Sequence, residues 1–360
     1  MDVYRIFKPV IFISRVLCLA PFAAVEESGS TRYKFSTLWL LYSILGVCAF
    51  FISNISVFWS PTSISNEALQ NAFTQVASSV ICMPSVVVQV FCLNNGKNVL
   101  RILDHVSALD SEHIGARISY YRLYRVFIFH LICCIITLVT FNGTWFAAVD
   151  TNYAYIFEMV YYITLFFFSD VVLLLSDTQF IHFVLLLKYR FSALNDTVIN
   201  FPVQSLYKTS LNHMIRATAV DRSVHSNTSA VSSSVTVLKS TVRKVCRHHD
   251  SLCDISEFVN RTYSFQILLS VTLACLEVIF TTHSVTSEFS DFVILQYFSS
   301  TEFLSKSTVF WIFAMTAKVV LLVAVCNLAT HEVSGLHLWC PHVWFLNTWL
   351  TEKHTVTELV

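Results

Sequence analysis

The sequence predicts an all-α polytopic membrane protein, a helical bundle of six clear transmembrane helices. Of its 360 residues, 55% are hydrophobic and only 13% are charged, whereas a soluble domain has about 25% charged residues. A surface with so little charge does not suit water. Six apolar stretches also reach the roughly 20 residues that cross a bilayer core of about 30 Å. The formal net charge of zero excludes the basic surface that nucleic-acid binding requires.

The six stretches follow one another along most of the chain. They are residues 35–59, 71–93, 126–149, 155–187, 264–285 and 308–328. The fourth stretch is longer than one span needs and carries Asp170 and Asp177, which share a helix face. We therefore expect its last turns to leave the lipid as a cytosolic helix on which both carboxylates are solvated. An intramembrane carboxylate pair is the alternative.

The basic residues predict the orientation, because short loops rich in Lys and Arg stay in the cytosol. Of the 23 basic residues, 20 precede the first stretch, lie between the second and third, or lie between the fourth and fifth. The N-terminus is thus predicted to be cytosolic, which does not fit a G-protein-coupled receptor. The predicted parts are a cytosolic N-terminal segment 1–34, a transmembrane bundle 35–333 with a cytosolic loop 188–262, and a divergent C-terminal tail 334–360.

One charge falls within the sixth stretch. A lone Lys318 at that depth costs at least about 2.5 to 3.5 kcal/mol on membrane-insertion scales. One interpretation is an intramembrane charge pair with Glu277 of the fifth stretch, or an ion path. The other is a side chain that reaches the membrane interface.

Enzyme and metal signals are weak in this sequence. No phosphate-binding glycine loop, nucleophile elbow or HExxH motif occurs, so we expect neither an enzyme nor a cofactor. Cys246, His248, His249 and Cys253 are zinc-type ligands, but their spacing lacks the close pairs of structural zinc sites. We therefore interpret them as polar residues on a helix face and expect no metal.

A ligand pocket could form at the outer ends of the third, fourth and fifth stretches. Trp145, Tyr153, Glu158 and Thr282 are the candidate pocket residues. Aromatic residues at such positions also form interfacial belts in any membrane protein, and that interpretation stays open for Trp145 and Tyr153.

Three segments carry a family resemblance when they are compared together. The first is Phe7-Lys8-Pro9-Val10, followed by Ile13-Ser14-Arg15 and Leu19-Ala20-Pro21-Phe22. The second leads into the fifth stretch, and its characteristic residues are His249, Leu252, Cys253, Asp254, Asn260, Tyr263 and Gln266. The third is Cys326-Asn327-Leu328-Ala329-Thr330-His331-Glu332. Together they resemble the insect gustatory receptor family, over residues 1 to about 333.

The resemblance implies a chemosensory receptor in the plasma membrane of sensory neurons. Its subunits would assemble, as homo- or hetero-tetramers, into a ligand-gated non-selective cation channel that responds to a soluble small-molecule tastant. The family has a seventh, pore-lining helix with a Thr-Tyr…Gln-Phe signature. After Glu332 this sequence departs from that pattern, so the seventh helix is expected to be missing or replaced.

Two other functions remain as alternatives. A truncated or alternatively spliced receptor subunit that regulates but does not conduct would fit the unusual ending. A secondary transporter would predict internal repeats and helices broken by Gly or Pro near the midplane, and neither is visible in the sequence.

Overall fold

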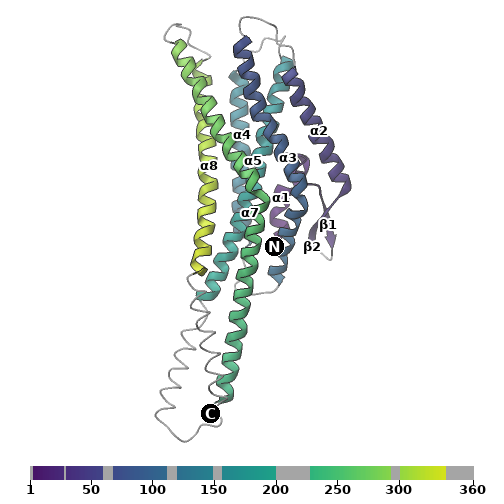
Figure 1. Cartoon of the computed structure of the whole chain (residues 1–360), viewed down its shortest axis with the longest axis vertical. Helices are drawn as coiled ribbons and strands as arrows, with labels where there is room; N and C mark the ends of the chain where they lie inside the picture. Colours follow the sequence, from purple (N-terminus) through teal and green to yellow (C-terminus); the bar gives the residue numbers. More distant parts are fainter. Residues whose placement is uncertain are drawn as a thin grey trace. The chain divides into compact units, whose positions relative to one another are not determined.

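The chain forms long helices with one small hairpin near its start. The computed structural model describes residues 3–27, 30–59, 68–111, 120–148, 156–199, 228–292 and 301–337. The helices are α1 (Val3–Val16), α2 (Thr37–Trp59), α3 (Ala68–Ser111), α4 (Tyr120–Ala148), α5 (Ile156–Ile199), α7 (Thr228–Phe292) and α8 (Thr301–His337), and the strands are β1 (Phe22–Glu27) and β2 (Ser30–Phe35). Figure 1 labels these elements along the chain. The protein is thus an all-α polytopic membrane protein, as predicted.

Five of the described helices contain a stretch long and apolar enough to cross a membrane. These stretches are Thr37–Ile55, Tyr120–Thr140, Phe167–Thr197, Arg243–Phe280 and Val309–Ser334. They correspond to the first, third, fourth, fifth and sixth predicted spans. The second predicted span, 71–93, falls inside α3, but the side chains of its first half lie outside the described residues, so its membrane crossing stays a prediction.

The chain divides into two compact units. The first unit holds residues 1–107, 119–184 and 258–325, and the second holds 108–118, 185–257 and 326–360. The first unit contains the hairpin and most of the apolar stretches. The divisions predicted from the sequence at 1–34, 188–262 and 334–360 follow membrane sides, which the structure does not test.

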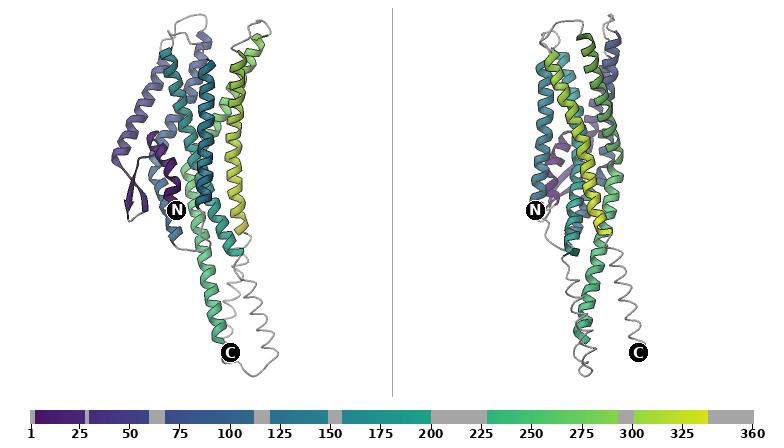
Figure 2. Two further views of the ribbon diagram at one scale, coloured as in Figure 1. Left: turned by 180° about the vertical axis from the view of Figure 1, so that it is seen from behind. Right: turned by 90° about the vertical axis from the view of Figure 1, so that its left-hand side faces the viewer.

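Helix α5 is the central helix of the first unit. Its apolar stretch is 78% buried, whereas the other four stretches are only 17 to 33% buried. Within the first unit α5 touches six other helices, through the ring pairs Phe183–Phe7 and Phe168–Phe50, the hydrogen bonds Ser169–Ser85, His182–His130 and Tyr263–Gln179, and the ion pair Lys318–Asp177. The helices can be followed in two further views in Figure 2. Asp170 and Asp177 on α5 are therefore enclosed by protein rather than lipid.

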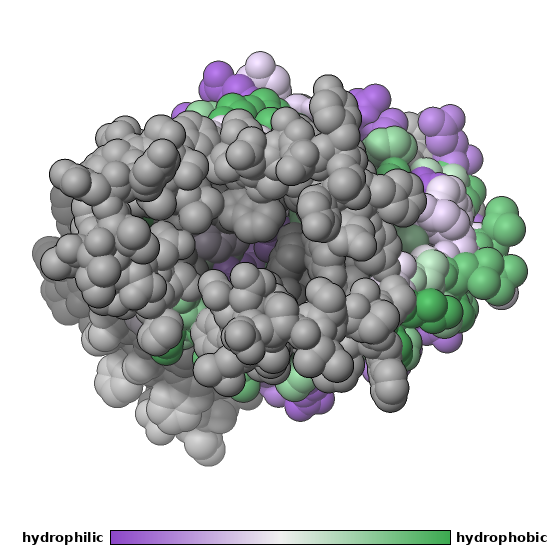
Figure 3. Space-filling model, turned by 90° about the horizontal axis from the view of Figure 1, so that it is seen from above, coloured by the Kyte–Doolittle hydropathy of each residue, from purple (hydrophilic) through white to green (hydrophobic). Residues whose placement is uncertain are grey.

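The outer helices show apolar side chains at their surface. Leu38, Leu45, Phe129, Phe313 and Val323 are each more than 60% exposed. In the view from one end, hydrophobic residues also appear at the outer rim of the described part of the chain, on the right of Figure 3. Such exposure would be costly in water, so these faces fit contact with lipid.

Helix α1 is amphipathic and packs its apolar side into the first unit. Its buried residues recur every three or four positions and include Val3, Phe7, Val10 and Ser14. The ring of Phe7 stacks on Phe183 of α5 at 4.6 Å. The hydroxyl of Tyr4 hydrogen-bonds to Asp104 of α3, and burial raises the pKa of that hydroxyl.

A two-stranded antiparallel hairpin follows α1, and it was not predicted from the sequence. Strands β1 and β2 pair from Phe22 with Phe35 to Glu27 with Ser30. Between α1 and the hairpin, Cys18 has a φ of 62°, a left-handed conformation that is typical where helices end. The hairpin was missed because the apolar residues that follow α1 continue the hydrophobic pattern of the helix itself.

Candidate functional site

The first unit encloses a group of charged side chains on three membrane-spanning helices. Lys318 Nζ on α8 lies 2.7 Å from Asp177 Oδ2 on α5. The hydroxyl of Ser270 on α7 donates a hydrogen bond to the same carboxylate oxygen over 2.7 Å. Asp177 is only 1% exposed. In this arrangement the two buried charges balance each other, and the hydrogen bond from Ser270 further stabilises the carboxylate.

The two aspartates of α5 are therefore not solvated, and that interpretation of the sequence was wrong. Asp170 is 8% exposed and Asp177 1% exposed. The physical reason is that α5 lies at the centre of the first unit, so neighbouring helices cover the turns that a peripheral helix would present to water. Lys318 correspondingly does not extend to an interface, because it ends on Asp177.

Glu277 of α7 lies beside the same group. Its carboxyl is hydrogen-bonded to the Trp311 side chain of α8 and interacts electrostatically with Lys318. Glu277 is 6% exposed. The predicted charge pair of Lys318 with Glu277 stays a prediction, because the ion pair at 2.7 Å is with Asp177.

A cavity of about 50 Å³ lies next to these side chains. It is lined from α5 by Asp170, from α7 by Glu277 and from α8 by Trp311 and Lys318, while α4 contributes Thr137 and the other lining residues are apolar. A water molecule needs about 10 to 15 Å³ of such space. The cavity thus has room for a few waters or one small ion.

A second polar network joins two of the segments that carried the family resemblance. The hydroxyl of Tyr263 on α7 donates to Gln179 Oε1 on α5 over 3.3 Å, and Gln179 Nε2 donates to Ser14 Oγ on α1 over 2.6 Å. Gln266, one turn after Tyr263, donates from Nε2 to Cys92 Sγ on α3 over 3.1 Å. These side chains hold four helices of the first unit together.

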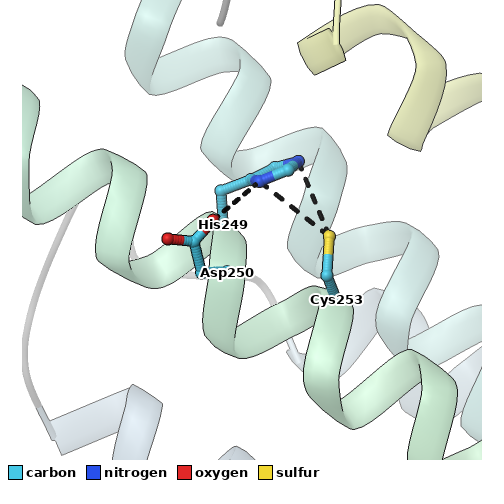
Figure 4. A network of polar contacts seen from close by, with 3 residues as sticks. All are labelled: His249, Asp250 and Cys253. Atoms are coloured by element: carbon cyan, nitrogen blue, oxygen red, sulfur yellow. Dashed lines mark hydrogen bonds and ion pairs between the residues drawn. The ribbon is translucent and has the colours of Figure 1, made fainter.

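The remaining residues of the second segment lie before the fifth span, on α7 in the second unit. His249 contacts Cys253 over 3.7 to 3.9 Å, and its Nδ1 lies 3.6 Å from the exposed carboxylate of Asp250 (Figure 4). Leu252 is buried and Asp254 is exposed. Asn260, which belongs to the first unit, is also exposed. The ring of Phe191 on α5 packs edge-on against the His249 imidazole, with 6.0 Å between the ring centroids.

The zinc-type ligands do not gather around one point. Among the residues that the structure describes, no group of three or more His, Cys, Asp or Glu side chains is placed to hold a metal ion. His249 and Cys253 are one helical turn apart, and Figure 4 shows the imidazole turned toward the thiol. His249 and Cys253 thus lie on one face of α7, and the expectation that no metal binds there stays a prediction.

The third segment also makes a specific contact, in the second unit. Asn195 Nδ2 on α5 donates to the backbone oxygen of Glu332 over 3.1 Å and to its carboxylate over 3.2 Å. Helix α8 therefore continues through the segment and ends at His337. Residues 334–337 of the predicted tail 334–360 thus belong to α8, and the rest of that tail lies outside the described residues.

The candidate pocket residues receive little description. Trp145 and Glu158 belong to α4 and α5, but their side chains lie outside the described residues, as does the whole of Tyr153. Thr282 on α7 is exposed, and its hydroxyl donates to the backbone oxygen of Val278 over 2.6 Å. Whether these four residues share a pocket stays a prediction.

The structure adds functional candidates that were not singled out from the sequence. Gln179, Ser270 and Trp311 are new, and Asp177 had not been paired with Lys318. One signal was available: a lysine within an apolar span needs an acid from another span, and Asp177 lies within the longest apolar stretch. No comparable signal marks Gln179, which is uncharged and lies in the middle of α5, because its hydrogen-bond partners come from other helices.

Comparison with known families agrees with the resemblance. The chain matches the 7tm chemosensory receptor family over residues 7–338. No curated protein matches the chain. The match includes the Tyr263 network, the charge group around Lys318 and the Asn195–Glu332 contact, so the features described above lie within the family's own extent. The chain therefore belongs to the 7tm chemosensory receptor family, whose members are receptors rather than enzymes.

Proposed function

We propose that the chain is a gustatory receptor subunit of the plasma membrane of sensory neurons. It binds a soluble small-molecule tastant and contributes to a ligand-gated, non-selective cation conductance. The observation that carries the proposal is the family match over residues 7–338, which covers all the described apolar spans. The three segments that resemble insect gustatory receptors narrow the chemosensory role to taste.

The physical basis of the response is a ligand-dependent balance between two arrangements of the helices. A ligand shifts that balance only by the difference between its affinities for the two arrangements. Trp145, Tyr153, Glu158 and Thr282 are the proposed ligand contacts. The proposal also includes a cytosolic N-terminus, the cytosolic segments 1–34 and 188–262, and assembly with like subunits as a tetramer.

Central helix α5 suits such a response. It is in contact with α7 through Gln179 and Asp177 and with α8 through Asp177. A shift of α7 or α8 on ligand binding would have to break or carry along these polar contacts, because each is buried or partly buried. Small movements are then converted into discrete changes of packing rather than absorbed gradually.

The test is electrical recording from cells that lack chemosensory receptors. The full chain is expressed alone and together with other subunits of the family, and a panel of soluble sugars, bitter compounds and amino acids is applied. We expect a ligand-evoked inward current whose reversal potential is unaffected when Na⁺ is replaced by K⁺. Cell-surface labelling of a tagged chain serves as the control for expression.

Two outcomes would contradict the proposal. If the chain reaches the surface with its partners and only modifies currents that the partners carry, it is a non-conducting regulatory subunit. If a panel compound is accumulated inside the cells without a matching conductance, the chain is a transporter. The tetramer is tested separately by counting subunits in single purified particles.

A further inference from the structure

The charge balance of the group around Lys318 is uneven. Three carboxyl groups, those of Asp170, Asp177 and Glu277, interact with the single ammonium of Lys318. Asp177 is the closest of the three, with its Oδ2 2.7 Å from Lys318 Nζ, and it also accepts a hydrogen bond from the hydroxyl of Ser270. The ammonium of Lys318 is therefore paired mainly with Asp177. The carboxyl groups of Asp170 and Glu277 line the cavity without an equally close positive charge from the described residues.

Asp170 is the side chain that lacks a local partner. It is 92% buried, as the complement of its 8% exposure, and it lines the 50 Å³ cavity. It forms no hydrogen bond with any residue in the described ranges, and its interactions there are electrostatic, with Glu277 and Lys318. A buried carboxylate without a partner is strongly unfavourable, so it is either protonated or balanced by a further positive group next to it.

The cavity limits what that positive group can be. Its volume corresponds to about three or four water molecules, so a large organic ligand does not fit in it. The ammonium of Lys318 in the same wall repels a divalent ion about twice as strongly as a monovalent one, and the described residues offer no set of three ligating side chains for a divalent ion.

We propose that this cavity is a binding site for one small monovalent cation, of the alkali or ammonium type, held by Asp170 and Glu277. The carboxylate oxygens and a few waters supply its coordination, and the Lys318–Asp177 pair forms the neutral wall beside it. The site lies within the bundle on α5, α7 and α8. It does not depend on the proposed conductance, because the bundle buries these carboxyl groups whether or not it carries a current.

Thermal stability tests the site on the full chain in lipid nanodiscs. Unfolding is followed in chlorides of Na⁺, K⁺, ammonium and methylammonium, with N-methyl-D-glucamine chloride holding the ionic strength constant. That ion is too large for the cavity. We expect a saturable rise in Tm, roughly 5 °C when a fitting cation is about 100-fold above its Kd. The order of the four cations distinguishes an alkali site from an ammonium site.

Substitutions assign the response to the cavity. Asp170→Asn and Glu277→Gln should each abolish the cation-dependent rise in Tm. Asp196→Asn, which removes an exposed carboxylate from the same helix α5, should leave the rise unchanged. Ala314→Leu fills the cavity from α8 without changing any charge, and it should also abolish the rise.

The same measurements can overturn the proposal. Equal Tm in all salts at constant ionic strength would do so, as would an undiminished response in Asp170→Asn. A Tm that depends on pH but on no cation would show that protons balance the carboxyls instead. If the variants do not fold, binding of ²²Na⁺, ⁸⁶Rb⁺ and ¹⁴C-methylammonium to the wild-type chain decides, and no saturable binding overturns the site.

Discussion

The hydroxyl of Tyr263 donates a hydrogen bond to Oε1 of Gln179 over 3.3 Å, and this contact ties α7 to the central helix α5. Gln179 also donates to Ser14, so the amide satisfies both neighbours at once. Tyr263 is 1% exposed, and its ring lies 5.8 Å from that of Phe183. Tyr263, a residue of the second segment that carries the family resemblance, thus contributes both packing and a hydrogen bond to the first unit.

Tyr263→Phe is expected to lower the free energy of unfolding by about 0.5 to 1.5 kcal/mol, the usual net worth of one hydrogen bond. The ring and its packing are kept, so only the hydroxyl contact with Gln179 is lost. Chemical denaturation in detergent–lipid micelles measures the change. Tyr121→Phe is the matched control, because Tyr121 is 63% exposed. An equal loss in both variants would contradict a specific role for the contact.

Lys318→Met is expected to be destabilising by about 3 to 5 kcal/mol, because it leaves Asp177 charged and buried without its cation. Adding Asp177→Asn should recover most of that loss, since the uncompensated charge is then removed. The four members of the cycle are compared by denaturation. Lys8→Met, at an exposed position on α1, is the control. Additive effects of the two substitutions would contradict the ion pair.

Gly46→Ala and Gly143→Ala are expected to act in opposite directions. A Cβ at Gly46 would collide with Cys18 Sγ, whereas a Cβ at Gly143 meets nothing within 4 Å. We expect Gly46→Ala to cost about 1 to 3 kcal/mol through overpacking. Gly143→Ala should gain up to about 1 kcal/mol, because alanine is the better helix former. Differential scanning fluorimetry measures both.

The rescue of Gly46→Ala identifies the clash. Cys18→Ala removes the Sγ atom and leaves a Cβ 3.3 Å from the new methyl of Ala at position 46, so the double variant should regain most of the lost stability. A double variant as unstable as Gly46→Ala alone would show that the helix backbone, rather than the thiol, limits the space there.

Asn54 and Asn195 both lie in Asn-x-Ser/Thr sequences, and neither is expected to carry a glycan. The amide of Asn54 is buried and donates to the backbone oxygen of Phe50 over 2.8 Å. The amide of Asn195 donates to Glu332. When the chain is produced in insect cells and treated with a glycosidase, we expect no change in its electrophoretic mobility that is due to these two sites. A shift that disappears in Asn195→Gln would place the end of α5 outside the cell and contradict the predicted orientation.

The apolar spans could be predicted because each is a property of a contiguous stretch of sequence. The residues 37–55 and 309–334 show this, since lipid-facing helices are apolar on nearly every side. The continuation of α5 beyond one span was also predictable from its length. The surroundings of α5 were not, because hydrophobicity does not distinguish a helix covered by lipid from one covered by other helices.

Pairings between distant residues are the part that the sequence does not reveal. Lys318 signalled that it needed a partner, but Glu277 and Asp177 were both available, and only the helix arrangement decides which carboxylate lies at 2.7 Å. The hairpin at residues 22–35 carried a Ser28-Gly29 dipeptide, a common turn signal. That signal was outweighed because the preceding residues continue an apolar stretch.

The ion pair of Asp177 and Lys318 also orders events during synthesis of the chain. Lys318 follows Asp177 by 141 residues, so at about 5 to 20 residues per second it is made roughly 7 to 28 s later. During that interval α5 is in or near the membrane with a carboxylate that its final partner cannot yet reach. Insertion of α5 therefore has to tolerate a carboxyl group without its ion-pair partner until α8 emerges.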